Sequence, residues 1–197
     1  MKNKKINFFK KGFKESFDYV KSSKNYIYSV IGVFAIFVLL GFFIPVPESI
    51  HQIITNFIND LVSKTENLSY PGLIGFIFFN NIQSSFFGMI YGIVLGIFPV
   101  LASIANGYLL GFVASEVSKQ EGIFILWRLL PHGIFELPAL FISFGLGLKL
   151  GSFVFHEKKF ETLKNYFLNS LKVFFFIVFP LILIAALIES TLIFFFG

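Results

Sequence analysis

Several stretches of this 197-residue chain are apolar for long enough to cross a lipid bilayer. A spanning helix needs about 20 mainly apolar residues, because the hydrocarbon core is about 30 Å thick. The apolar run 73–113 is long enough for two such helices, and we place a tight turn at residues 97–100, around Pro99. The sequence therefore predicts an all-α, polytopic membrane bundle of about five spanning helices, at residues 26–44, 73–95, 99–115, 124–148 and 173–196.

Composition excludes several classes of protein. Hydrophobic residues make up 56% of the chain and charged residues only 14%, whereas soluble domains carry roughly 25% charged residues. The chain has no cysteine, which excludes disulfides, thiol catalysis and cysteine-ligated metals. Although the net charge is +5, we expect no nucleic-acid partner, because the basic residues follow membrane topology. We expect a multi-pass protein of the cell membrane that is surrounded by the lipid bilayer.

Lysine distribution predicts the orientation of the bundle. The arm formed by residues 1–25 has eight lysines against two acidic residues, and the connection 149–172 has five lysines against two. The segments 45–71 and 115–122 each carry a net negative charge. Cytoplasmic flanks are rich in Lys and Arg. Five crossings then place the N-terminus inside and the C-terminus outside.

Two segments outside the spans have apolar residues at helical spacing. In the basic arm this pattern is typical of a helix that lies on an anionic membrane surface. The second segment, residues 47–66 of the predicted membrane domain 26–197, is expected to be an external helix. That helix could lie on the outer interface, cap the bundle or dock a partner. The apolar positions are Ile6, Phe9, Phe13, Phe17 and Val20 in the arm, and Ile50, Ile53, Ile54, Phe57, Ile58 and Leu61 in the external helix.

Small residues at four-residue intervals predict how the helices pack. Helices in lipid associate through close contact of such residues, because burying apolar side chains against each other gains nothing there. We expect these stripes to join helices within one chain, and a homo-oligomer face is the alternative. They contain Gly88, Gly92 and Gly96 in the second span, and Gly107 and Gly111 in the third.

Polar residues in the predicted spans form the candidate site. Arg128, His132 and Glu136 are four residues apart, so they share one helical face. Charged groups at membrane depth cost roughly 2.5–3.5 kcal/mol each on insertion scales. Pro131 and Pro138 are expected to bend this helix. Counting inward from the span boundaries predicts one internal polar cluster in or near the outer leaflet, made of Asn80, Asn81, Asn106, Arg128, His132, Glu136 and Glu189.

Two interpretations of this cluster remain open. It could be a structural hydrogen-bond network that ties the helices together. It could instead be a ligand or metal site, because His132 and Glu136 present two potential ligands for a divalent metal on one face. A glutamate near the midplane could also relay protons. No second histidine lies nearby, as a zinc-protease motif would require.

Several motifs together resemble the stage II sporulation protein M family. They are the Asn80-Asn81 pair, the glycine stripe before Pro99, Asn106-Gly107-x-x-x-Gly111, and the run Leu-Pro-His-Gly-Ile-Phe-Glu-Leu-Pro-Ala at residues 130–139. The Pro-His-Gly-x-x-Glu-x-Pro-Ala pattern within this run is the most specific of them. The resemblance covers most of the chain.

The resemblance implies a scaffold. The founding member of the family looks like a membrane component that holds cell-wall hydrolases during engulfment of the forespore, although many relatives occur in organisms that do not form spores. We therefore expect a non-enzymatic organising component of a cell-envelope complex, with membrane or envelope proteins as partners. The alternative is a transporter or a membrane-embedded enzyme built around the polar cluster.

Overall fold

The computed structural model describes residues 2–124, 126 and 130–196, with side chains for residues 9–124, 126 and 133–195. Within these residues the chain is helical and contains no strand. The helices are α1 (Lys2–Ser22), α2 (Lys24–Phe43), α3 (Glu48–Thr65), α4 (Tyr70–Ile90), α5 (Ile97–Glu121), α6 (Leu130–Gly151), α7 (Lys159–Val173) and α8 (Phe179–Phe196). Shorter segments are the 3₁₀-helices η1 (Tyr91–Ile93) and η3 (Ser152–Phe155) and the π-helix η4 (Phe174–Val178).

In the described part of the chain, five helical segments are long and apolar enough to cross a membrane. This finding confirms the predicted all-α membrane fold and its number of spanning helices. The fifth segment joins α7, η4 and α8 into 37 residues, which is about 55 Å of helix and exceeds the hydrocarbon thickness. The segments are Lys24–Phe43, Tyr70–Ile93, Ile97–Glu121, Gly133–Phe155 and Lys159–Phe195.

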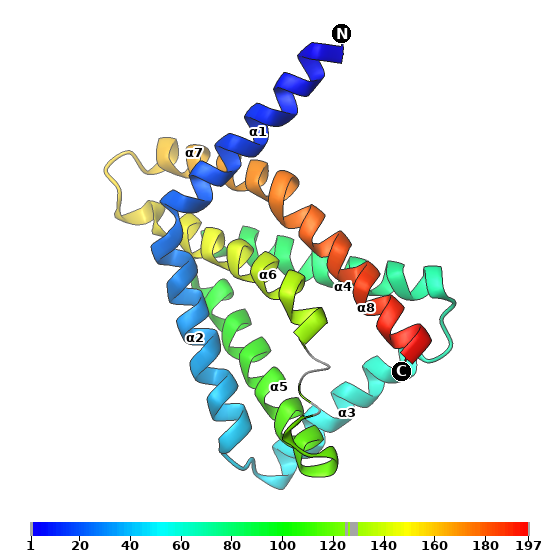
Figure 1. Cartoon of the computed structure of the whole chain (residues 1–197). Helices are drawn as coiled ribbons and strands as arrows, with labels where there is room; N and C mark the ends of the chain where they lie inside the picture. Colours follow the sequence, from blue (N-terminus) through cyan, green and yellow to red (C-terminus); the bar gives the residue numbers. More distant parts are fainter. Residues whose placement is uncertain (1, 125, 127–129, 197) are drawn as a thin grey trace.

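The two ends of the bundle differ in charge. Helices α1 and α7 lie together at one end, which we call the basic end, and α3 lies across the other, which we call the α3 end (Figure 1). Lys172 on α7 donates a 2.6 Å hydrogen bond to Glu15 on α1. At the α3 end, His51 lies 3.6 Å from Glu116 of α5. Both lysine-rich segments therefore share one end and both acidic segments the other, as five crossings require.

Glycines allow the closest helix contacts. A methyl group at Gly107 of α5 would lie 2.6 Å from the carbonyl oxygen of Phe34 on α2, and one at Gly111 would overlap the carbonyl oxygen of Val38. Gly88 faces the fully buried ring of Phe144 on α6. Gly92 packs in the same way on the backbone of Gly147, and Gly96 on Leu148. These stripes thus join α5 to α2, and the end of α4 to α6, within one chain.

The turn between α4 and α5 lies at residues 94–96, and the expected turn at residues 97–100 is wrong. Leu95 and Gly96 both adopt positive φ, of 54° and 70°, which reverses the chain before the proline. Pro99 is buried in the first turn of α5, where the missing N–H of proline is tolerated. The turn packs on Gly151, so this hairpin reaches the basic end.

The helix that carries the family motif begins later than expected. It begins at Leu130, not near residue 124. Pro131 lies in the first described turn of α6. Pro138 is the proline inside α6. The third spanning helix is longer than its predicted range 99–115, because α5 continues to Glu121.

Candidate functional site

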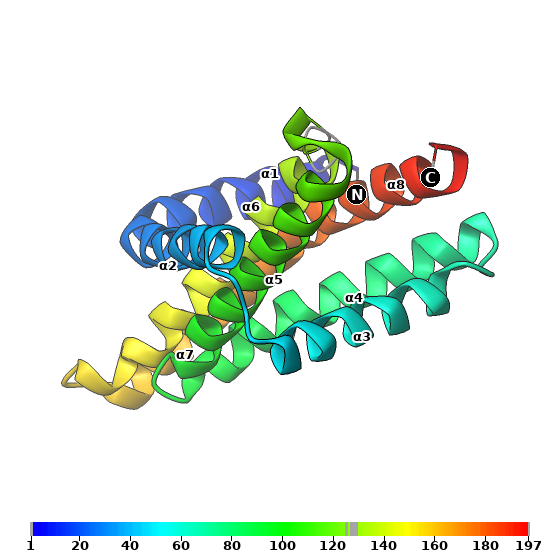
Figure 2. The same ribbon diagram turned by 90° about the horizontal axis from the view of Figure 1, so that it is seen from below.

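Three of the predicted site residues line one cavity at the α3 end. Asn80 and Asn81 of α4 and Glu189 of α8 surround a space of about 210 Å³. Helix α3 runs alongside α4 (Figure 2) and contributes Leu61, Val62 and Thr65 to the lining. The remaining wall is apolar and consists of Phe76, Ile77 and Ile193.

Nearby contacts fix the position of α8 beside this cavity. The hydroxyl groups of Tyr70 on α4 and Thr191 on α8 are 2.9 Å apart, and Ser190 is fully buried. The Oε2 atom of Glu189 is shielded from solvent, and this carboxylate has an interaction partner. The cavity therefore combines one carboxylate and two carboxamides with an apolar wall, which is a chemistry suited to a small polar ligand.

The structure describes the other predicted site residues to different extents. Asn106 donates a 2.8 Å hydrogen bond to the carbonyl oxygen of Ala102 within α5, and it does not line the cavity. Glu136 lies on α6 with its Oε2 atom shielded from solvent, and it too has an interaction partner. His132 lies in the first turn of α6, but its side chain falls outside the described residues, as does all of Arg128.

The metal interpretation requires the side chain of His132 beside Glu136. Among the residues that the structure describes, no three His, Asp or Glu side chains come close enough to hold a metal ion. That set does not include the side chain of His132. The pairing of His132 with Glu136 on a divalent metal therefore stays a prediction.

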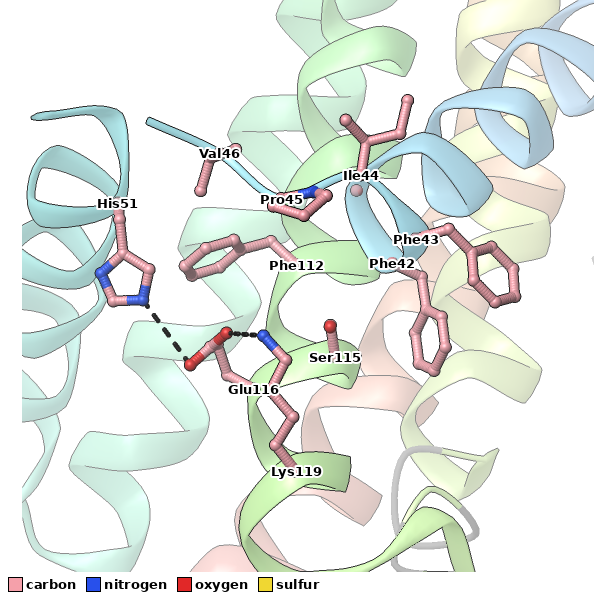
Figure 3. Close-up of a pocket in the computed structure, with 11 residues that line it drawn as sticks. Phe42, Phe43, Ile44, Pro45, Val46, His51, Phe112, Ser115, Glu116 and Lys119 are labelled. Carbon is pink, nitrogen blue, oxygen red and sulfur yellow. Dashed lines mark hydrogen bonds and ion pairs between the residues drawn. The ribbon is translucent and has the colours of Figure 1, made fainter. Parts of the chain in front are cut away.

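A second pocket at the α3 end was not predicted from the sequence. It has a volume of about 310 Å³ and lies between the end of α2, the link 44–46, α3 and α5 (Figure 3). His51 points from α3 toward Glu116, with its Nε2 atom 3.6 Å from Oε2, and Lys119 donates a 2.7 Å hydrogen bond to Oε1 of the same carboxylate. The His51 ring also meets the ring of Phe112 edge-on, with centroids 5.2 Å apart. These contacts connect α3 to α5.

The burial of Lys149 at the basic end was also not predicted from the sequence. Lys149 of α6 is only 6% exposed. Its ammonium donates hydrogen bonds of 2.9 Å to Ser23 and 3.3 Å to Ser22, and it lies 3.9 Å from the centroid of the Tyr19 ring. Burial raises the pKa of the Tyr19 phenol, so this hydroxyl stays protonated. Hydrogen bonding and cation–π attraction thus connect α1 to α6.

Residue types alone gave no signal for either contact. His51 and Glu116 are remote in sequence, and only the predicted topology puts both of them outside. Lys149 resembles an ordinary flanking lysine of a spanning helix, because its burial depends on where α1 docks. Such contacts follow from tertiary packing and cannot be found in a local pattern.

The fold and the buried polar groups define a class, the polytopic α-helical membrane proteins that carry polar residues among their spanning helices. Within this class, the chain belongs to the stage II sporulation protein M family, whose model matches residues 30–192. The resemblance noted in the sequence is thereby confirmed. No curated protein and no solved structure matches the chain. The matched region begins within α2 and includes the residues that line both pockets of the α3 end, except Ile193, but it does not include α1.

Proposed function

We propose that this protein is a scaffold of the cell membrane that holds cell-envelope proteins through α3. The observation that carries the proposal is the exposure of this helix. All of α3 is described by the structure, and none of its residues is buried. Large apolar side chains are among these unburied residues, including Ile53, which is 68% exposed, and Phe57, which is 50% exposed.

An exposed apolar surface rimmed by polar groups is typical of an interaction site. The exposed polar groups of α3 include the Asp60–Lys64 pair. His51, in the first turn of α3, anchors this end of the helix to Glu116 and Phe112 of α5. The family resemblance, which implies a scaffold for cell-wall hydrolases, supports the same function.

Photo-crosslinking in native membranes tests the proposal. A photoreactive amino acid at Ile53 or Phe57 is expected to capture a specific envelope protein. The matched control is Phe79, which is equally large and 62% exposed but lies on the spanning helix α4. If α3 positions capture no protein beyond those captured from Phe79, the scaffold proposal is rejected.

A second candidate function rests on the cavity of Asn80, Asn81 and Glu189. These residues favour a transporter or a membrane-embedded enzyme, because polar and charged groups on spanning helices are costly unless they have a use. Asn81→Ala and Glu189→Gln are expected to abolish such an activity while the protein still inserts and folds. If both folded variants complement a deletion strain fully, this candidate is rejected and the scaffold function is unaffected.

A further inference from the structure

Helix α1 docks on the bundle through one face that is rich in small residues. Gly12 lies against the ring of Phe176 in η4. Ser16 is fully buried, and Glu15 accepts the hydrogen bond from Lys172. Together with the Lys149 contacts, these interactions hold α1 across α7 at the basic end (Figure 1). The helix therefore has a fixed rotational orientation.

A phenylalanine stripe remains outside this docked face. Phe9, Phe13 and Phe17 are 50%, 46% and 60% exposed, and their four-residue spacing aligns them along the helix. The rings of Phe9 and Phe13 pack against the ring of Phe176 in edge-to-face arrangements, with centroid distances of 6.0 and 5.4 Å. The neighbouring Phe175, on η4 within the apolar fifth span, is itself 60% exposed. The stripe is thus continuous with the surface that faces lipid.

The charges of α1 are sorted around the helix. With 3.6 residues per turn, the docked face is followed by the phenylalanine stripe and then by Lys10, Lys14 and Lys21, all of them exposed. The acidic residues lie on the other side of the docked face, where Glu15 and Asp18 line an open pocket with Lys172. Three lysines therefore line the side of the apolar stripe that is turned away from the bundle, whereas Glu15 and Asp18, with Lys11 paired to Glu15, lie beyond the docked face.

We propose that α1 is an interfacial helix that binds anionic lipid at the basic end of the bundle. The phenylalanine stripe enters the boundary between headgroups and acyl chains, and the three adjacent lysines contact lipid phosphates. This arrangement is that of amphipathic helices that recognise anionic membranes. Helix α1 lies outside the family-matched residues, so the proposal is independent of the scaffold function.

Spin labelling of the full chain in vesicles tests the proposal. Because the chain has no cysteine, Phe17→Cys and Asp18→Cys each provide a single labelling site. In vesicles that contain phosphatidylglycerol, the label at position 17 is expected to be several-fold less accessible to a water-soluble nickel relaxant than the label at position 18. Equal accessibility of the two adjacent positions would overturn the proposal.

The lipid specificity is tested with the lysines. The shielding at position 17 is expected to weaken in vesicles of phosphatidylcholine alone, and the change Lys10→Gln, Lys14→Gln and Lys21→Gln together is expected to remove the difference between the two lipid compositions. Lys64→Gln, an exposed lysine on α3, is the matched control and should change nothing. If the shielding of the label at position 17 is the same in both lipid compositions and is unchanged by the triple substitution, the assignment to anionic lipid is overturned. Thermal unfolding in detergent checks that each variant is folded.

Discussion

Replacing Gly111 by alanine should force α2 and α5 apart. The added methyl group would overlap the carbonyl oxygen of Val38 and lie 3.0 Å from the backbone nitrogen of Phe42. Backbone atoms cannot rotate away as a flexible side chain does, so the two helices must separate. Overpacking of this kind typically costs about 1–3 kcal/mol. For a protein of this size, each kcal/mol lowers the unfolding temperature by about 2–4 °C, which predicts a fall of about 2–12 °C.

Thermal unfolding of the purified protein in detergent measures this effect. The matched control is Gly32→Ala on α2, because a methyl group there meets no atom within 4 Å. Alanine also favours a helix over glycine by about 1 kcal/mol, so the control should unfold at the same temperature or slightly higher. If Gly111→Ala and Gly32→Ala unfold together, the close contact between α2 and α5 does not carry the stability assigned to it.

Three further changes probe the ends of the bundle. Lys149→Met should release α1, because the lysine's hydrogen bonds to Ser22 and Ser23 and its cation–π contact with Tyr19 are lost. Limited trypsin digestion should then cleave the chain faster at the end of α1 while the remaining helices stay intact. The hydrogen bond from Lys172 holds the pKa of Glu15 in the folded protein below its ordinary value. The ionised carboxylate therefore contributes its full stabilisation of α1 docking at pH values above the ordinary pKa. This stabilisation is lost as the pH falls through the lower pKa of the folded protein. A spin label on α1 should then become more mobile upon acidification, whereas Glu15→Gln should show no such step. His51→Ala should free α3 from α5 and accelerate amide hydrogen exchange in α3, while Gln52→Ala, whose hydrogen bond stays within α3, should not.

The spanning helices were predictable because their signal is local. Hydrophobic runs of sufficient length and the lysine distribution determine the number of crossings and which segments share an end. The amphipathic α3, found at Glu48–Thr65, lies close to its predicted range 47–66 for the same reason. The turn before α5 was misplaced because Pro99 is a strong turn signal in a sequence, whereas the reversal depends on the positive φ of Leu95 and Gly96.

The candidate site was predictable only in part. Depth counting grouped Asn80 with Glu189, and the structure places both on one cavity. The same counting grouped Asn106 with them, but depth gives no information on which way a helix faces, and Asn106 bonds within its own helix. Rotation of each helix is set by packing, such as Gly111 on Val38, and a single sequence does not reveal which stripe meets which helix.

The π-helix η4 makes the bundle sensitive to insertion and deletion at one place. A π-turn accommodates an additional residue within a helix, so loss of one residue from Phe174–Val178 would restore regular α-helix. Everything beyond that point would then rotate by about 100° relative to α7. The fully buried side of α8, with Ile182, Ala185 and Ser190, would turn toward lipid, and Glu189 would leave its cavity. One residue of chain length thus sets which side of α8 meets its neighbours and which side meets the bilayer.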